Sequence, residues 1–362
     1  MMLLINNETV EKILDMKGCL EALETGYRDL IEQRASYRPR IDTFVPTDKP
    51  DVMYRWGTME GVSRSFETFA IRMKSDMLHW PEGKTVEKFC IEPGTYCGLI
   101  LVFSTRNAEP LAIVNDGVIQ HMRVGASAGL GAKYLARGDA SVVGMIGSGG
   151  MARTYLAAFH EVRNIQQVKV FSPTKTNRES YAREMSARLG IQVSAKNSLE
   201  EAVRGSSIVA TCTDSMQVII QDPSWIEQGT YLTCVRPNEW APEVLEACDV
   251  VIKLGRGTIT NLDEGMQRIA GYAAYVAGAN SEMQQIQKPT VDLFEKRRPL
   301  LTEVMSGKVK GRTDEKQKAF FLNDGTQGLQ FASVAGYVFH KAKKLGLGQE
   351  IPTNWFTQNI RD

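Results

Sequence analysis

Short apolar runs recur through the middle of the chain and alternate with segments of helical spacing. The run Val142–Ile146 contains no polar side chain, which is typical of a central strand in a parallel sheet that is covered on both faces. Apolar residues at helical spacing follow in 151–162. The other strand-like runs are 168–171, 191–194, 208–211, 231–235 and 250–253, with helical stretches near 179–189 and 198–203. Strands that alternate with helices in this way predict a doubly wound parallel sheet of the α/β class.

A glycine-rich turn follows the first of these runs directly. Residues 147–152 read Gly-Ser-Gly-Gly-Met-Ala and fit the dinucleotide-binding pattern G-x-G-x-x-G/A. In that pattern the glycines allow a tight turn and a close approach of the backbone to a pyrophosphate. A plain glycine-rich turn is the alternative, but the strand before the motif and the helix after it favour a Rossmann domain that binds NAD(P). The expected cofactor-binding residues are Gly147, Ser148, Gly149, Gly150, Met151 and Ala152.

An α+β module, and not a second Rossmann unit, is expected before this domain, because the glycine motif begins only at residue 147. Apolar positions in 1–34 recur at steps of three and four, which predicts a largely helical segment. We expect extended segments at 40–45, 51–56, 69–74 and 98–103, and a surface insertion at 77–95. The long amphipathic helix predicted at 328–345 comes after the last Rossmann strand, so we expect it to return to the first module.

Composition and charge narrow the classes of partner. With 43% hydrophobic residues, 23% charged residues and a net charge of +1, the chain gives no reason to expect nucleic acid or an anionic membrane as a partner. No apolar run approaches the roughly 20 residues that cross a bilayer, and no signal peptide is recognisable, so we expect a cytoplasmic protein. The six cysteines and four histidines lack the spacing of metal ligands, which favours reduced thiols and no metal.

The order of several short motifs resembles the ornithine cyclodeaminase/mu-crystallin family, and the resemblance covers nearly the whole sequence. The motifs are Pro39-Arg40, the cations Arg72 and Lys74 on one strand, Met122–Ala128 (MRVGASA), the glycine motif, Glu201–Gly205, Thr211–Thr213 and Gly311–Thr313. In that family a substrate-binding and dimer-forming domain, built from both chain ends, faces a Rossmann domain across a cleft. The resemblance implies a homodimer, with a substrate-binding and dimerisation domain at 1–125 and 311–362 and a Rossmann domain at 126–310.

The resemblance assigns substrate binding to Arg40, a cation on the strand 69–74, and Arg123. A planar guanidinium can bind a carboxylate with two parallel hydrogen bonds and so fix an α-carbon against a nicotinamide. The lysine of the family aligns best with Arg72, but residues two apart on a strand face the same side, so Lys74 is an alternative. The distinction matters because a lysine can exchange protons with an imine nitrogen, whereas an arginine stays charged.

One position departs from the cyclodeaminases. Those proteins carry an aspartate after the fifth strand, where this chain has Asn238. An amide cannot act as a general base, so cyclodeamination becomes less favoured, although the neighbouring Glu239 would compensate if the loop shifts.

A second departure concerns the cofactor. The strand 168–171 ends in Ser172, not in the Asp or Glu that would hold the ribose 2′-hydroxyl of NAD. Thr174, Lys175 and Arg178 follow, and this neutral to cationic loop tolerates a 2′-phosphate. We therefore favour NADP over NAD, with a merely solvated turn as the alternative. By resemblance, Thr211 and Thr213 complete the expected cofactor-binding residues.

The expected function is an oxidoreductase that transfers hydride between NAD(P) and the α-carbon of an imino or amino acid, as an amino-acid dehydrogenase or a ketimine or cyclic-imine reductase does. Arg72, Lys74 and Asn238 are the candidate catalytic residues. One alternative is a cyclodeaminase-type lyase that releases ammonia and recycles its bound NAD. Another is an NADP-dependent binding protein without catalysis.

Overall fold

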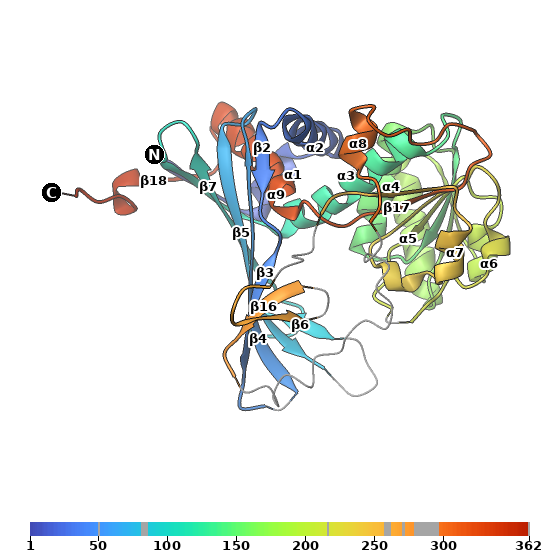
Figure 1. Ribbon diagram of the computed structural model, residues 1–362, viewed down its shortest axis with the longest axis horizontal. Coiled ribbons are helices and arrows are strands. Elements are labelled where there is room, and N and C mark those ends of the chain that lie inside the picture. The colour runs from blue at the N-terminus through green and yellow to red at the C-terminus, as the bar shows by residue number, and fades with distance from the viewer. Residues whose placement is uncertain are drawn as a thin grey trace. The chain divides into compact units, whose positions relative to one another are not determined.

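The computed structural model describes residues 1–49, 51–80, 86–215, 217–256, 262–269, 272–278 and 297–360 (Figure 1). The chain forms two compact units. We call them the sheet unit, which comprises Met1–Gln120, Arg256–Lys288 and Thr326–Asp362, and the Rossmann unit, which comprises His121–Gly255 and Pro289–Gly325. None of the helices in the described ranges is long and apolar enough to cross a membrane.

The Rossmann unit is built on a seven-stranded parallel sheet whose neighbours follow the order β11, β10, β9, β12, β13, β17, β14. The strands are β9 (Val142–Ile146), β10 (Gln167–Phe171), β11 (Gln192–Ala195), β12 (Ile208–Thr211), β13 (Tyr231–Cys234), β14 (Val250–Lys253) and β17 (Ala319–Leu322). The order reverses between β9 and β12, which is where doubly wound sheets bind their ligands. The predicted fold class is confirmed.

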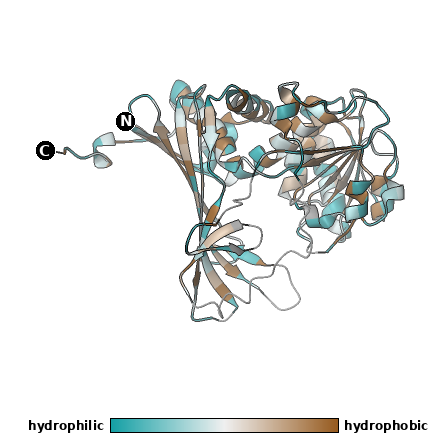
Figure 2. Ribbon diagram, in the orientation of Figure 1, coloured by the Kyte–Doolittle hydropathy of each residue, from teal (hydrophilic) through white to brown (hydrophobic). Residues whose placement is uncertain are grey.

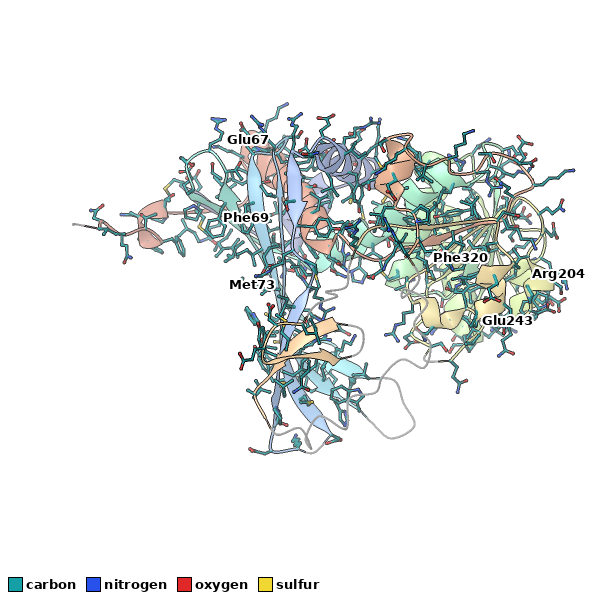
Figure 3. All side chains as sticks on the ribbon, in the orientation of Figure 1. Glu67, Phe69, Met73, Arg204, Glu243 and Phe320 are labelled. Atoms are coloured by element: carbon teal, nitrogen blue, oxygen red, sulfur yellow. The ribbon has the colours of Figure 1, made fainter. Side chains whose placement is uncertain are left out.

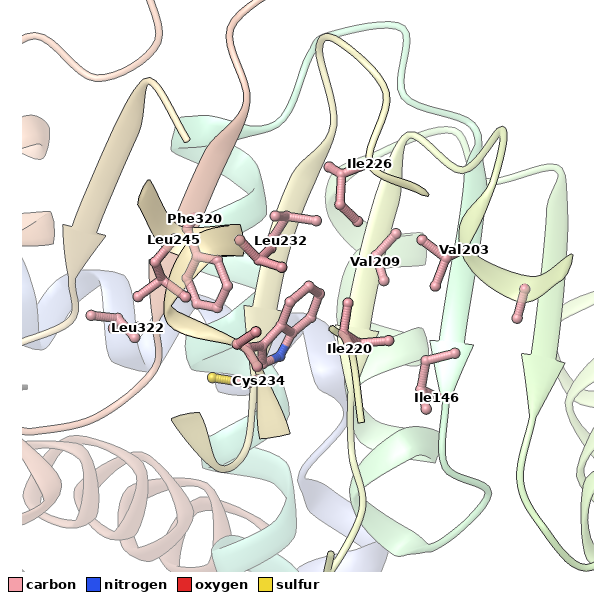
Figure 4. Close-up of a cluster of buried hydrophobic side chains, with 14 residues drawn as sticks. Ile146, Val203, Val209, Ile220, Ile226, Leu232, Cys234, Leu245, Phe320 and Leu322 are labelled. Carbon is pink, nitrogen blue, oxygen red and sulfur yellow. The ribbon is translucent and has the colours of Figure 1, made fainter. Parts of the chain in front are cut away.

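The central strands β9, β12, β13 and β17 are almost completely buried, which explains why they are mainly apolar (Figure 2). On one face, strand residues such as Leu232 and Phe320 pack with Trp240 and with helices α6 (Leu199–Val203) and α7 (Pro242–Glu246) (Figure 4). On the other face, the hydroxyl of Tyr231 donates to the carbonyl of Ala128 in α3 (Gly117–Leu135). The remaining elements with described bounds here are α4 (Gly150–Val162), α5 (Lys175–Leu189), α8 (Leu301–Met305), η1 (Pro223–Trp225) and η2 (Pro237–Glu239).

Strand β17 is the main difference from the expected order of the Rossmann strands. The sequence indicated 250–253 as the last strand, but β17 inserts between β13 and β14 and pairs with both. Its four residues are fully buried. From the sequence pattern alone, such a short apolar run cannot be assigned to a strand rather than to the segment before the helix that follows. Residues 311–325 therefore group with the Rossmann unit, whereas the expected boundary placed 311–362 in the other domain.

The sheet unit contains an eleven-stranded sheet with the main order β15, β16, β3, β4, β5, β7, β8, β1, β18, to which β2 and β6 add at β4 and β5. The strands are β1 (Met2–Ile5), β2 (Ala35–Tyr37), β3 (Ile41–Pro46), β4 (Val52–Ser63), β5 (Thr68–His79), β6 (Glu87–Phe89), β7 (Cys97–Ser104), β8 (Pro110–Asn115), β15 (Met266–Ile269), β16 (Tyr272–Val276) and β18 (Gln349–Ile351). Strands β15 and β16 also lie in the range 126–310 that was expected to be wholly Rossmann.

The C-terminal helix α9 (Gln327–Leu345) packs on β4 and β5, so it returns to the first module as expected. A Cβ atom at Gly328 would overlap the backbone of Glu60, which shows how closely the helix lies on the sheet. A short 3₁₀ turn, η4 (Thr353–Trp355), follows β18 near the C-terminus.

The N-terminal segment is largely helical, as its apolar spacing predicts, although it begins with a short strand. It contains β1, then α1 (Asn7–Ile13) and α2 (Met16–Ile31). The side chains of Asn6 and Asp15 accept hydrogen bonds from the backbone N–H groups of Thr9 and Gly18, and these caps start the two helices separately. The expected insertion at 77–95 contains the end of β5 and strand β6, while its residues 81–85 lie outside the described ranges.

Candidate active site

The side chains of β5 alternate strictly between a buried inner face and a partly exposed outer face. The inner face carries Arg72, Lys74 and Asp76, and each of them is no more than 8% exposed. Arg55 and Gly57 of β4 lie opposite Asp76 and Lys74. Because side chains two apart on a strand point to the same side, Arg72 and Lys74 share this face, as the sequence predicts.

Buried carboxylates accompany the cations of this face. Asp42 on β3 accepts two hydrogen bonds from Arg40, with Nε–Oδ1 and Nη2–Oδ2 distances of 2.7 and 2.6 Å. The Oδ2 atom of Asp76 lies 2.5 Å from Nη2 of Arg55 and 3.0 Å from Nζ of Lys74. Arg40 and Lys74, which the sequence assigned to one substrate site, thus belong to one buried ionic cluster.

Two glycines leave the space that this arrangement needs. In the sheet, Lys74 has Gly57 as its partner on β4 and Gly98 as its partner on β7. A Cβ atom on Gly57 would collide with the carboxylate of Asp42, and one on Gly98 would collide with that of Asp116. The carboxylates of Asp42 and Asp116 therefore each occupy space beside a glycine that pairs with Lys74. A residue with a side chain at either glycine would displace the carboxylate.

Arg72 has a separate set of partners. Its Nε donates to Oδ2 of Asp116 at 2.6 Å, and its Nη2 lies 2.5 Å from the same oxygen. The guanidinium also lies over the ring of Phe331 in α9, 5.4 Å from the ring centroid. Arg72 is therefore anchored by an aspartate after β8 and by the covering helix.

The environment of Lys74 favours the loss of its charge. Burial lowers the pKa of its ammonium well below the ordinary value, and the positive charges of Arg40 and Arg55 lower it further, against the opposing effects of Asp76 and Asp42. For Asp76, burial raises the pKa, but the charges of Lys74 and Arg55 outweigh it and bring the pKa to about 2. Asp76 is thus ionised at neutral pH, and Lys74 is the group that can change its charge.

Sequence reasoning missed the carboxylates of this face and Arg55. Strand alternation offered a signal for Asp76, because it lies two residues beyond Lys74. No comparable signal marked Asp116, which lies 44 residues from its partner Arg72 in the sequence.

In the Rossmann unit the glycine turn has the geometry that a dinucleotide needs. Gly147 has a φ of +109°, and a Cβ atom there would meet the carbonyl of Cys212. Gly149 caps α4 without any side-chain hydrogen bond, and the space where its Cβ would lie is open within 4 Å. Ala152 is fully buried where the helix packs on the sheet. The N–H groups that begin α4 are therefore available to a pyrophosphate, and the turn fits the expected cofactor.

The loop after β10 differs in detail from expectation. Ser148 Oγ donates to Ser172 Oγ at 3.0 Å, which joins this loop to the glycine turn. Arg178 is 8% exposed, donates to the carbonyl of Ser172 at 2.9 Å and lies over the ring of Phe171. Arg178 therefore holds the backbone of its own loop, whereas Lys175 is exposed to solvent.

Thr211, Thr213, Asn238 and Glu239 gather at the carboxyl ends of β12 and β13. Asn238 is half-buried, and its Nδ2 donates to the carbonyl of Ser215 at 3.3 Å. Glu239 is fully buried, and the hydroxyl of Thr213 donates to its Oε1. In this arrangement the carboxyl has no exposed surface, so it would reach a substrate only after a shift of the loop.

Arg123 lies on α3 in the Rossmann unit and is 8% exposed. Its helix neighbours Ala126 and Ala128 are completely buried. The structure thus brings Arg40, Arg72 and Lys74 together in the sheet unit, and it places Arg123 with Asn238 in the Rossmann unit.

Comparisons with known proteins identify a family and several relatives of this chain. A sequence model described as the ornithine cyclodeaminase/mu-crystallin family matches residues 93–345. The chain is 22% identical to a Delta(1)-pyrroline-2-carboxylate reductase of Bacillus cereus over 296 residues, which cover 81% of this chain and 83% of the relative.

Two solved structures have a similar fold over almost the whole chain. The Thermococcus litoralis Delta(1)-pyrroline-2-carboxylate reductase, in complex with NADH and L-proline, is 25% identical with a TM-score of 0.75 and covers 97% of this chain and 100% of its own. An archaeal alanine dehydrogenase dimer with bound NAD is 21% identical with a TM-score of 0.73 and covers 97% and 99%. Because the family match spans more than half of the sequence, the chain belongs to the ornithine cyclodeaminase/mu-crystallin family.

Proposed function

We propose that this protein is an NAD(P)-dependent oxidoreductase that transfers hydride between the nicotinamide and the α-carbon of an amino or imino acid. The observation that carries the proposal is Lys74, a buried lysine whose pKa is lowered and which lies beside the Arg40–Asp42 pair. The dinucleotide turn supports the cofactor, and relatives that reduce pyrroline carboxylate or oxidise alanine support chemistry at a carbon–nitrogen bond.

Lys74 exchanges a proton with the substrate nitrogen in this proposal. The bound nicotinamide nucleotide supplies or accepts the hydride. A lysine with a lowered pKa can give a proton from Nζ to the substrate nitrogen at a pH closer to neutrality, and in the reverse direction the neutral Nζ takes a proton from that nitrogen. Asp76 holds Nζ in place at 3.0 Å, and Arg40 and Arg123 bind the substrate carboxylate.

Arg72 has a supporting role and does not exchange protons. Its guanidinium is bonded to Asp116 and lies over the ring of Phe331, and a guanidinium is a poorer proton donor than an ammonium group. The sequence did not decide whether Arg72 or Lys74 is the key cation of this strand. Of the two, Lys74 is thus the better proton donor.

The cyclodeaminase alternative lacks its base. Asn238 has an amide where cyclodeaminases carry an aspartate, and Glu239 is buried and bonded to Thr213. Reduction or dehydrogenation needs no carboxylate at this position, so the oxidoreductase is the function that the site supports best.

Replacement of Lys74 by Met should reveal its role in proton exchange. We expect kcat/KM for NADPH-dependent reduction of imines to fall by about 10²–10⁴, the range that a positioned acid or base contributes. The assay follows NADPH absorbance with cyclic imines and with 2-oxo acids plus ammonia or methylamine. Lys12→Met, which removes an exposed lysine in α1, is the control and should leave the rate unchanged. Ammonia release from ornithine without net nucleotide turnover would contradict the proposed function.

NADP is the cofactor that we propose over NAD. The loop from Ser172 to Arg178 contains no carboxylate that would repel a 2′-phosphate, and Lys175 is exposed on its α5 end. Arg178 supports this loop by donating to the carbonyls of Ser172 and Pro173.

A carboxylate at residue 172 should reverse this preference. Ser172→Asp should shift the ratio of the Kd values for NADP and NAD towards NAD by at least about tenfold, or 1.4 kcal/mol, because the new charge repels the 2′-phosphate and accepts from a free 2′-hydroxyl. Ser180→Asp adds the same charge at an exposed site on α5 and should leave the ratio unchanged. Calorimetric titration measures both constants, and tighter binding of NAD than NADP by the unmodified protein would refute the preference.

We also propose that the protein forms a homodimer through the outer face of the sheet unit. Trp56, Leu99 and Tyr275 are between 36% and 40% exposed on this face, and Phe69 and Met73 of β5 lie on it as well (Figure 3). Contiguous apolar surface of this kind marks an interaction site, and a two-fold pair is the commonest assembly.

Light scattering at micromolar concentration should give twice the mass of one chain. Leu99→Glu should shift the equilibrium towards the monomer because it places a charge in the middle of the apolar face. Leu345→Glu, at another exposed leucine at the end of α9, is the control and should remain dimeric. A monomer mass for the unmodified protein would exclude the homodimer.

A further inference from the structure

Glu239 is a buried carboxyl that the proposed chemistry does not use. It lies in the turn after β13, next to the loop that follows β12. That loop begins beside the glycine turn, because the carbonyl of Cys212 occupies the space that a Cβ of Gly147 would need. The loop therefore borders the position where the sheet order reverses and a dinucleotide binds.

Several hydrogen bonds join the turn after β13 to this loop, which we define as the latch loop, residues 213–215 and 217–220. The hydroxyl of Thr213 donates to Oε1 of Glu239 and accepts from the backbone N–H of Ser215 at 3.1 Å. The backbone N–H groups of Ile219 and Ile220 donate to the carbonyl of Glu239 at 2.8 and 3.0 Å. Glu239 thus contacts both ends of the latch loop.

The two oxygens of the Glu239 carboxyl have unequal surroundings. Oε1 has the hydroxyl of Thr213 as a donor, and the hydroxyl of Thr211 also bonds to the carboxyl. Oε2 is buried and has no hydrogen-bond partner within the described residues. A buried oxygen without a donor is costly, and far more so when the group is ionised, so this geometry favours the neutral acid.

We propose that Glu239 is a positioning residue whose neutral carboxyl fixes the latch loop beside the glycine turn and thereby strengthens dinucleotide binding. The inference rests on the nicotinamide-dependent function proposed above. Ionisation of Glu239 favours a displaced latch loop in which water reaches Oε2, and the displaced loop binds the nucleotide more weakly.

The titration of Glu239 falls in the physiological range. Burial raises its pKa to about 7, against the hydrogen bonds of Thr211 and Thr213 and the positive charge of Arg236. Among the described residues, the thiols of Cys212 and Cys234 also interact with Glu239, and burial raises the pKa of each thiol.

The sign of the effect on stability follows from the raised pKa. The native protein holds this proton up to about pH 7, while the unfolded chain releases it near the ordinary value of 4.5. The contribution to stability is fully present below pH 4.5 and is lost as the pH rises through 7. The nucleotide-free protein should therefore unfold at a lower temperature as the pH rises across this window.

The experiment measures Kd for NADH and for NADPH by fluorescence titration between pH 6 and 8.5. For a single proton with a pKa of about 7, linkage allows the Kd of the unmodified protein to rise by about eightfold between pH 6.5 and 8. Glu239→Gln keeps the shape and stays neutral, so it should remove this rise and flatten the pH dependence of thermal unfolding. Glu243→Gln, an exposed carboxylate on α7, is the matched control and should keep the rise (Figure 3).

The pH dependence of Kd distinguishes the positioning role of Glu239 from the proposed function. A Kd of the unmodified protein that does not depend on pH overturns the positioning role even if no variant folds, and so does a rise that persists unchanged in Glu239→Gln. Either result leaves nucleotide binding itself intact. Absence of NADH and NADPH binding at every pH would instead overturn the proposed function, and the positioning role with it.

Discussion

The candidate site depends on the pairing of buried charges on one face of a sheet. A buried cation in such a place is costly unless a carboxylate lies next to it, and Arg40, Arg55 and Arg72 are paired with Asp42, Asp76 and Asp116 respectively. Lys74 is the fourth cation and shares the carboxylate of Asp76 with Arg55. Among the described residues, this face therefore carries four cations and three carboxylates. Lys74 can remove the excess positive charge, because its ammonium group can lose a proton and a guanidinium does not do so readily.

The same physical rule has the opposite result in the Rossmann unit. Asp42 and Asp76 are buried beside cations, and their pKa values are lowered. The carboxyl of Glu239 is buried with two threonine hydroxyls as its main partners, and its pKa is raised to about 7. Partners, and not burial alone, thus decide which carboxyls of this protein are ionised at neutral pH.

Local sequence patterns predicted the parts of the structure that depend on local physics. The apolar run 142–146 and the glycines after it specify a covered parallel strand and a tight turn, and both are present. Strand alternation likewise placed Arg72 and Lys74 on one face. The insertion of β17 between β13 and β14 was not predictable, because it depends on pairing between segments far apart in the chain.

Partners of side chains were equally hard to predict. Arg178 has the charge and position of a phosphate ligand, yet it bonds to the carbonyl of its own loop, because a buried guanidinium must satisfy its donors. Asp116 binds Arg72 only because Gly98 has no side chain, a fact that becomes evident once β7 and β5 are paired.

The effect of the surrounding charges on Lys74 can be measured as the pKa of its ammonium group. NMR titration of the protein with isotope-labelled lysine, with the Lys74 signal assigned by its loss in Lys74→Arg, gives the pKa of this ammonium group. We predict a pKa well below the ordinary 10.5, because burial and the neighbouring Arg40 and Arg55 disfavour the charged form. A pKa at or above 10.5 would contradict the account, since Lys74 would then be an ordinary partner of Asp76 and not the group that changes its charge.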